Sequence, residues 1–444
     1  MKPGQRPRPR LLSLAFRNLA RHKVKTAITV TAVALGIVAY LYIDAFIAGV
    51  NTESRRNLVN YEMGAATIYS RAYWENKDDL PLYEGFRDWQ PIREALLRAG
   101  YSAVPRATFS GTLLSREEEL PFLFHGVDPA LERTMFRYPA WIEKGDSHTP
   151  GGRFPADGGF EVLLGVRGAK DLGVRVGDSV RLSTVIDKRD EQGVIRHINQ
   201  VLDLTVCGVI NSPDPVVNGY VGFLPLGILQ DELGILLEGS VTELIVRKAG
   251  AREDELPGAF EAPATIAARL GGALPSSLTV VGWQENAKDY LAASGGDMVQ
   301  SVVFLGFFFV IVLLVIANTV LMAVLERTRE IGMLRALGMQ DGSIVRLFFT
   351  ETALIGLLGA IVGVLLFLPL NYWMVNYGID YSGMMEQSGI TSFGYRVAGV
   401  FKSVWNFPTM AASLVLATAL ASVTALFPSL RAVRMTITDA LRMD

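Results

Sequence analysis

Few residues of this chain stand in a pattern that could do chemistry. The four histidines are scattered over 444 residues, and none is paired at the spacing of a metal site. His148 lies two residues after Asp146, and we favour an exposed turn there over a ligand pair. The single cysteine, Cys207, lies in an alternating apolar stretch, which predicts a buried thiol rather than a nucleophile. One cysteine also excludes an internal disulfide.

Nucleotide and nucleic-acid sites are equally absent from the sequence. There is no Gly-Lys dipeptide and therefore no P-loop, and there is no G-x-S-x-G elbow. The net charge of −2 gives no basic field for a nucleic acid. We therefore expect a non-catalytic chain that binds no metal, no cofactor and no nucleic acid.

The most informative run suggests binding rather than catalysis. Residues 325–343 read LERTREIGMLRALGMQDGS, a helical tract with Gly338 expected just after its end. Ile331, Leu334 and Leu337 repeat every three residues and form a small apolar stripe among charged residues. Such a short amphipathic helix is suited to docking in a partner's groove. A helix resting on lipid headgroups is the alternative.

The elements that position this run are membrane spans. Half of the residues are hydrophobic and only 19% are charged, against roughly 25% in soluble domains. Four stretches reach the roughly 20 apolar residues that a bilayer requires. They are residues 26–50, 298–325, 347–374 and 407–428. Pro369 should bend or end the third span, and Gly359 and Gly363 should permit close helix contact.

Positive charge sets the orientation of these spans. Lysine and arginine are concentrated in residues 1–25, a basic segment with an amphipathic portion, in the 326–346 loop and in the 429–444 tail. The 375–406 loop holds only Arg396 and Lys402. Both termini and the 326–346 loop are therefore expected in the cytoplasm, and 51–297 and 375–406 outside. Asp44 and Glu351 are acids within spans, for which interfacial and functional roles both remain open.

Residues 51–297 are too long for a loop and carry their own core signals. Mixed helix and strand patterns without a regular alternation predict an α+β domain. We expect two lobes, a membrane-proximal one from 51–115 with 260–297 and a distal one from about 116–259. The fold class is thus a four-helix transmembrane bundle with a large α+β extracytoplasmic domain. Six strands are expected at 119–124, 179–186, 201–210, 221–224, 242–246 and 278–281, and three helices at 89–99, 226–233 and 284–293. Residues 161–172 are expected to form the end of a strand followed by a short helix, with Gly173 just after that helix.

In residues 326–339 and in four other segments, the sequence resembles the FtsX-like permease family of ABC transporters, of the MacB and lipoprotein-releasing LolC-LolE type. The residues that carry the resemblance are ERTREIGMLRALGM at 326–339, LLGVRGAKDLGVRVGDSVRL at 163–182, TVCGVI at 205–210, LAFRNLARHK at 14–23 and TITDALR at 436–442. Asp439 stands where the family often has proline. Together these segments bracket nearly the whole chain.

The resemblance implies a permease subunit that couples ATP hydrolysis in a separate ATPase subunit to movement of its periplasmic domain. The coupling helix would comprise ten residues: Glu330, Ile331, Gly332, Met333, Leu334, Arg335, Ala336, Leu337, Gly338 and Met339. Implied partners are that ATPase, a second permease copy or paralogue in a dimer, membrane lipids, and an outer-leaflet or periplasmic substrate. A periplasmic chaperone or adaptor is a further implied partner. The implied location is the inner membrane.

Three functions remain open under this resemblance. A 247-residue outer domain without a fused ATPase is most similar to the lipoprotein-releasing permeases. The alternatives are a MacB-like efflux permease with an adaptor protein, and an FtsX-like signalling scaffold that activates an extracytoplasmic enzyme. The 375–406 loop is longer than expected for the first group.

Overall fold

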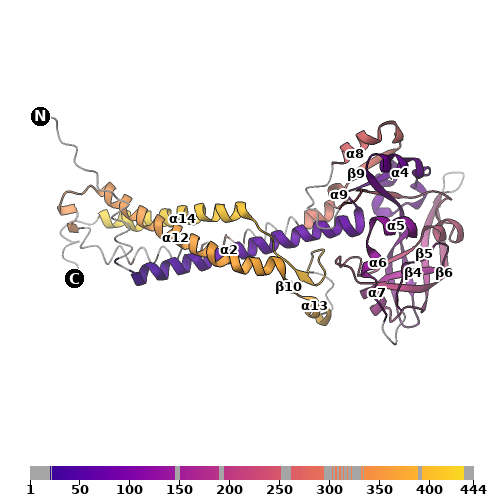
Figure 1. The fold of residues 1–444 in the computed structure, drawn as a ribbon, viewed down its shortest axis with the longest axis horizontal. Helices are drawn as coiled ribbons and strands as arrows, with labels where there is room; N and C mark the ends of the chain where they lie inside the picture. Colours follow the sequence, from indigo (N-terminus) through magenta and orange to yellow (C-terminus); the bar gives the residue numbers. More distant parts are fainter. Residues whose placement is uncertain are drawn as a thin grey trace. The chain divides into compact units, whose positions relative to one another are not determined.

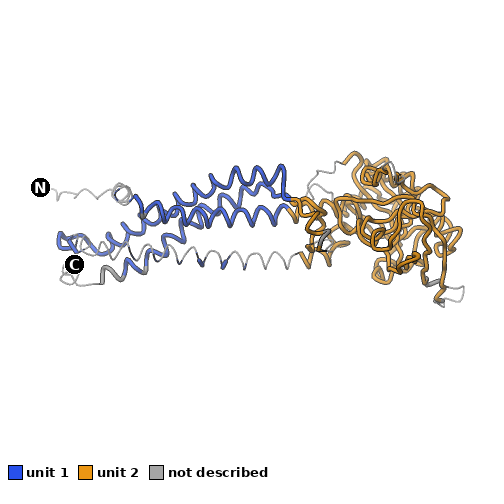
Figure 2. The backbone as a smooth tube through the Cα atoms, turned by 90° about the horizontal axis from the view of Figure 1, so that it is seen from below, with its two compact units in different colours: residues 1–49, 295–379, 402–444 blue, residues 50–294, 380–401 orange. Residues whose placement is uncertain are grey.

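The computed structural model describes residue 21, residues 23–145, 151–189, 195–251, 262–294, 335–388 and 393–434, and scattered positions between 303 and 333. The chain forms two compact units (Figure 2). Unit 1 comprises residues 1–49, 295–379 and 402–444, and unit 2 comprises residues 50–294 and 380–401.

Unit 1 is built from long apolar helices. Helix α2 (Lys23–Leu58) has its first part in this unit and is joined there by α12 (Asp341–Asn376) and α14 (Phe407–Arg434) (Figure 1). The described residues contain three helices that are long and apolar enough to cross a membrane, Thr26–Met63, Asp341–Asn376 and Phe407–Leu430. They match the first, third and fourth expected spans. The second, 298–325, lies almost wholly outside the described residues, so the structure gives three spans rather than a count of four.

Glycines let the backbones of these helices approach closely. A Cβ added at Gly359 would lie 2.6 Å from Val33 Cβ, and one at Gly363 would lie 2.9 Å from the Ala34 carbonyl oxygen. Helix α12 therefore meets α2 along a strip where no side chain fits, which confirms the close contact expected at both glycines. Pro369 lies inside α12 and does not end it, because the helix continues to Asn376.

Unit 2 is built on a nine-stranded sheet whose order is β3-β7-β4-β6-β5-β2-β8-β1-β9. Strand β2 also pairs with β3, so six strands close into a ring and β8, β1 and β9 extend from β2. Closure leaves the ring without free edges, which protects it from pairing with other chains. The strands are β1 (Ala66–Ser70), β2 (Tyr101–Leu114), β3 (Glu119–Val127), β4 (Glu161–Gly165), β5 (Ser179–Arg189), β6 (Ile195–Ile210), β7 (Val221–Pro225), β8 (Glu243–Lys248) and β9 (Leu278–Gly282).

Short helices cover this sheet. Helix α4 (Trp89–Arg98) buries Trp89, Ile92 and Leu96, the three-and-four spacing of one helical face. Helix α5 (Pro129–Met135) begins where the Asp128 carboxylate accepts two backbone N–H groups. The remaining helices are α3 (Arg71–Glu75), α6 (Tyr138–Trp141), α7 (Val166–Asp171), α8 (Pro263–Leu270) and α9 (Trp283–Asn286), with π-helical turns η1 (Val59–Met63) and η4 (Ile228–Glu232) and 3₁₀ turns η2 (Lys77–Asp79), η3 (Leu82–Glu84) and η6 (Gly271–Ala273).

The apolar core of unit 2 runs through the whole sheet. One cluster extends from Ala66 in β1 to Leu278 in β9 and includes Phe124, Leu164 and Leu204. It therefore takes residues from both expected lobes. An α+β fold is confirmed for the outer domain, and all six expected strands are present. Strands β1 and β2 were not expected, and β2 contains Pro105 and Gly111, two residues that weaken a strand signal.

Residues 380–401 also belong to unit 2, although they lie between the third and fourth spans in sequence. They carry α13 (Ser382–Ser388) and the short pair β10 (Ile379–Asp380) and β11 (Val400–Phe401). The Tyr381, Phe393 and Phe401 rings pack edge to face at centroid distances of 5.3–6.1 Å. The segment thus has a small core of its own.

Candidate functional site

The expected coupling helix is described only in part. Gly332, Met333 and residues 335–339 are described, whereas Glu330, Ile331 and Leu334 lie outside the described residues. Leu337 N–H donates to the Met333 carbonyl at 3.0 Å, and Gly338 follows with a φ of 87°. That left-handed conformation favours glycine and ends the helical turn.

Two apolar side chains of this segment are open to their surroundings. Leu337 is 84% exposed and Met333 is 48% exposed. An isolated exposed leucine is ordinary, but here it lies on a short helical turn beside a second apolar side chain. The pair forms a small apolar contact surface, with Ala336 exposed between them.

An ion pair fixes this turn to the start of α12. Arg335 Nε donates to Asp341 Oδ1 at 2.9 Å, and Asp341 is the first residue of α12. A carboxylate in the first turn of a helix is favourable because it faces the positive end of the helix dipole. The 335–338 turn is therefore held to the start of α12 by a charged contact as well as by the chain.

One of the two acids within the spans, Asp44, contacts the residue before α14. The Asp44 carboxylate accepts a hydrogen bond from Asn406 Nδ2 at 2.9 Å, and the amide oxygen of Asn406 accepts from the Thr409 N–H at 3.4 Å. Asp44 thus supports the residue that precedes α14, which favours the interfacial interpretation. Glu351 is buried in α12.

The residues that could have done chemistry are placed for packing. Cys207 is 5% exposed, and burial raises the pKa of its thiol to about 12, so the thiolate is not formed at neutral pH. His125 is buried, with Nδ1 3.0 Å from Thr108 Oγ1, and burial holds its pKa well below the ordinary value. Within the described ranges no three His, Cys, Asp or Glu residues could hold a metal ion.

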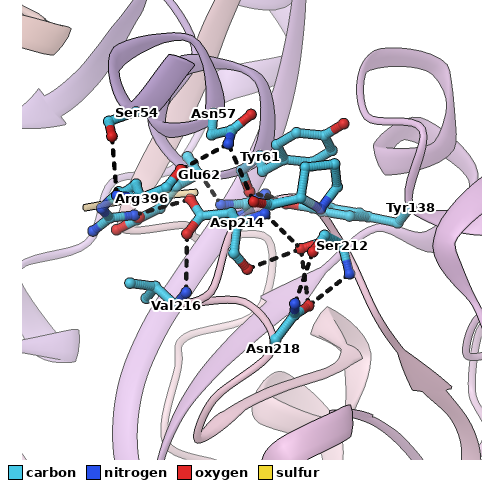
Figure 3. Close-up of polar contacts among 12 residues, drawn as sticks. Ser54, Asn57, Tyr61, Glu62, Tyr138, Ser212, Asp214, Val216, Asn218 and Arg396 are labelled. Atoms are coloured by element: carbon cyan, nitrogen blue, oxygen red, sulfur yellow. Dashed lines mark hydrogen bonds and ion pairs between the residues drawn. The ribbon is translucent and has the colours of Figure 1, made fainter. Parts of the chain in front are cut away.

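The densest polar site lies in unit 2, around Arg396 (Figure 3). Its guanidinium pairs with the carboxylate of Glu62 and lies 3.2 Å from Asp214 Oδ2. Its backbone is held too, because Arg396 N–H donates to Ser54 Oγ at 3.1 Å and its carbonyl accepts from Asn57 Nδ2 at 2.7 Å. One residue of the 380–401 segment thus binds the end of α2, η1 and the β6–β7 loop. We call these five residues the Arg396 hub.

The β6–β7 loop is shaped to present Asp214 to the hub. Ser212 N–H donates to Asn218 Oδ1 at 2.6 Å, and Asn218 Nδ2 returns a bond to the Ser212 carbonyl at 2.7 Å. Asp214 Oδ1 accepts from the Val216 N–H at 2.9 Å, and its side chain is fully buried. Burial raises the pKa of the Asp214 carboxyl to about 7, against the opposing effect of the Val216 hydrogen bond.

A second buried ion pair, Arg106 with Glu132, lies next to the hub, because Arg106 also contacts η1. Arg106 Nε donates to Glu132 Oε1 at 3.1 Å, and Arg106 Nη1 donates to the Glu62 carbonyl at 2.8 Å. The Tyr138 hydroxyl donates to the Tyr61 carbonyl. Both carbonyls belong to the π-helical turn η1, a rare geometry that is frequent at functional sites. Arg106 of β2 and Tyr138 of α6 therefore bind backbone carbonyls of η1, while Arg396 binds the Glu62 side chain of the same turn.

Sequence reasoning did not find this hub. The signal that could have pointed to it is that Arg396 is one of only two basic residues in the 375–406 loop. An arginine in a loop with few charged residues often has a partner, but no local pattern in the sequence names that partner.

Apolar helices that carry a large inserted α+β domain have the organisation of a membrane permease. The family model for the MacB-like periplasmic core domain matches residues 26–262, more than half of the chain, and that for the FtsX-like permease C-terminal region matches residues 302–437. The chain therefore belongs to the FtsX-like permeases of ABC transporters, with a MacB-like periplasmic core domain as its outer part.

Individual relatives agree with the family. The chain is 24% identical over 424 residues to the lipoprotein-releasing system transmembrane protein LolC of Neisseria meningitidis, covering 94% of each chain. It is 41% identical over 66 residues to the ABC transporter permease YtrF of Bacillus subtilis, which covers 15% of this chain and 13% of that one. It is 29% identical over 129 residues to the macrolide export protein MacB of Sodalis glossinidius, which covers 29% and 17%.

Proposed function

We propose that this chain is the membrane subunit of an inner-membrane ABC transporter that releases lipoproteins by mechanotransmission. The observation that carries the proposal is the match to a lipoprotein-releasing LolC protein over 94% of both chains. ATP would be bound by a separate ATPase subunit, and this chain would pair with a second copy or a paralogue. A periplasmic chaperone would accept the released lipoprotein.

The geometry of unit 1 supports a mechanical role. The exposed Leu337 is offered to the ATPase, and the Arg335–Asp341 pair passes its displacement to α12. Helix α12 meets α2 at Gly359 and α14 at Gly356, where an added Cβ would lie 2.9 Å from the Ala417 carbonyl oxygen. Close-packed helices move as solid bodies because their interiors are barely compressible. A push on the 335–338 turn is thereby shared by three helices.

A MacB-like efflux permease is the second candidate, favoured by the match to the Sodalis protein. A signalling scaffold that activates an extracytoplasmic enzyme is the third. Co-purification of the whole complex separates them. Lipoprotein release predicts a bound acylated protein, efflux predicts an adaptor protein, and the scaffold predicts a cell-wall hydrolase.

The coupling assignment is tested by Leu337→Asp in the full-length chain, co-expressed with its ATPase. Losing a buried leucine contact costs about 1.5–3 kcal/mol, and a desolvated carboxylate adds more. Since about 1.4 kcal/mol is tenfold in affinity, ATPase binding should weaken by about 100-fold or more. Leu237→Asp is the matched control, because Leu237 is 56% exposed in unit 2. If the same amount of ATPase co-purifies with both variants, residues 330–339 are not the coupling helix.

A further inference from the structure

The Arg396 hub joins segments that belong to different parts of the chain. Ser54 and Asn57 lie on the end of α2, and Glu62 lies in the turn that follows it. Arg396 lies in the segment that links α12 to α14, and Asp214 lies between β6 and β7. A shift of the end of α2 against the 380–401 segment therefore changes the distances within the hub or moves the β6–β7 loop.

Ion pairs, hydrogen bonds and a ring contact hold the hub together, because the Arg396 guanidinium also lies 5.7 Å from the centre of the Tyr290 ring. One guanidinium serves two carboxylates, with side-chain exposures of 14% for Arg396, 20% for Glu62 and 0% for Asp214. Among the described residues, the two large apolar clusters of the sheet include no member of the 380–401 segment. Charge-assisted hydrogen bonds are short and directional, so a small displacement of one partner breaks the contact.

The hub contains two carboxylates, those of Glu62 and Asp214, but one guanidinium, that of Arg396. When both carboxylates are ionised, a single arginine leaves one negative charge in excess. Asp214 Oδ2 lies 3.2 Å from the guanidinium, and Asp214 Oδ1 accepts from the Val216 N–H at 2.9 Å, so Asp214 keeps a hydrogen bond within its own loop when the contact with Arg396 opens. Removing the guanidinium altogether would leave two carboxylates facing each other with little water, which is strongly unfavourable.

We propose that Arg396 is a positioning residue whose contact with Asp214 opens and closes during the transport cycle, so that helix movement repositions the β6–β7 loop of the outer domain. This proposal rests on the proposed function. In the closed state seen here, Arg396 fastens the α12–α14 connection to the loop. In the open state Arg396 stays with Glu62 and α2, and the β6–β7 loop is released.

A cysteine pair reports the two states directly. Ala398 N–H donates to the Pro213 carbonyl at 2.9 Å. Standard bond lengths then limit the separation of the two Cα atoms to about 7 Å, within reach of a disulfide. The variant is Ala398→Cys with Pro213→Cys in the full-length chain. Cys207 can stay, because burial raises its pKa to about 12 and keeps it unreactive.

The measurement is the rate of disulfide formation in the complex with its ATPase, at rest and after trapping with ATP, magnesium and vanadate. We expect disulfide formation in the trapped complex to be at least about tenfold slower than at rest. A tenfold change is within the usual range of allosteric coupling. The control pair is Arg181→Cys with Asp203→Cys, cross-strand neighbours of β5 and β6, which should react equally in both states. Equal rates for both pairs would overturn the proposal.

Substitution of Arg396 separates positioning from mere folding. Arg396→Lys keeps the charge and should retain the difference between resting and trapped rates, whereas Arg396→Gln should cross-link slowly in both states. If Arg396→Gln does not fold, the cross-linking rates of Arg396→Lys and of the chain with Arg396 intact, each at rest and after trapping, still test the proposal. Fast cross-linking by Arg396→Gln at rest would refute the role of the guanidinium. Failure of any ATPase to co-purify with the wild-type chain would instead refute the proposed function.

Discussion

The contact between α2 and α12 has no room for a single added methyl group, which makes it a sharp test of the helix packing. A Cβ at Gly359 would lie 2.6 Å from Val33 Cβ, 2.7 Å from Val33 Cγ1 and 3.2 Å from the Val30 carbonyl oxygen. Carbon atoms in contact normally lie about 3.5–4.0 Å apart. Gly359→Ala must therefore push the two helices apart by about 1 Å, because a change of the Val33 rotamer would not move its Cβ atom.

The magnitude follows from two opposing effects. Overpacking a well-filled interface costs about 1–3 kcal/mol, while replacing a mid-helix glycine by alanine gains about 1 kcal/mol in helix propensity. Because the added Cβ would lie only 2.6 Å from Val33 Cβ, the upper end of the overpacking range applies, and the net loss for Gly359→Ala is about 2 kcal/mol. Gly342→Ala is the matched control, because Gly342 lies in the first turn of the same helix with no atom within 4 Å of an added Cβ. That variant should be neutral or slightly more stable.

The assay is thermal unfolding of the full-length chain in detergent, followed by tryptophan fluorescence and by trapping of aggregates. Gly359→Ala should lower the midpoint temperature by a few degrees, and Gly342→Ala should not. Combining Gly359→Ala with Val33→Gly should recover part of the loss, because glycine at position 33 removes both Val33 Cβ and Val33 Cγ1, the two atoms nearest the added methyl group. An unchanged midpoint for Gly359→Ala would refute the close contact between α2 and α12.

Three further results are expected. Glu132→Gln should destabilise the outer unit by about 3–5 kcal/mol, seen as increased protease sensitivity, because Arg106 would stay buried without a counter-charge; unchanged sensitivity would contradict it. Burial raises the pKa of Asp214 to about 7 from about 3.9 in the unfolded chain, so its contribution to stability is present in full below about pH 4 and is lost as the pH rises to about 7. Thermal stability should therefore fall more steeply between about pH 5 and pH 7 in the wild type than in Asp214→Asn, and parallel curves would refute this. Asp380→Cys, at an exposed position, should react with an impermeant thiol reagent from outside intact cells, and labelling only after permeabilisation would reverse the topology.

Much of this protein could be predicted from short stretches of its sequence. The apolar spans depend on about 20 consecutive side chains. Strands such as 179–186 and 221–224 alternate with a period of two or form a continuous apolar run. Gly338 and Gly173 end helices with positive φ, as glycines after a last helical turn do. All of these features are local, because each depends on bonds and contacts between near neighbours in the chain.

The tertiary structure alone decided which distant residues meet. Arg396 is 334 residues from Glu62 and 182 residues from Asp214, and the sequence around each gives no sign of the other two. The inclusion of residues 380–401 in the outer unit and the fit of Val33 against Gly359 are equally remote in sequence. Local propensity sets which segments become helix or strand, whereas ion pairs and close packing depend on where the folded backbone brings those segments. The membrane spans were therefore determined by the sequence, and the charged hub by the fold.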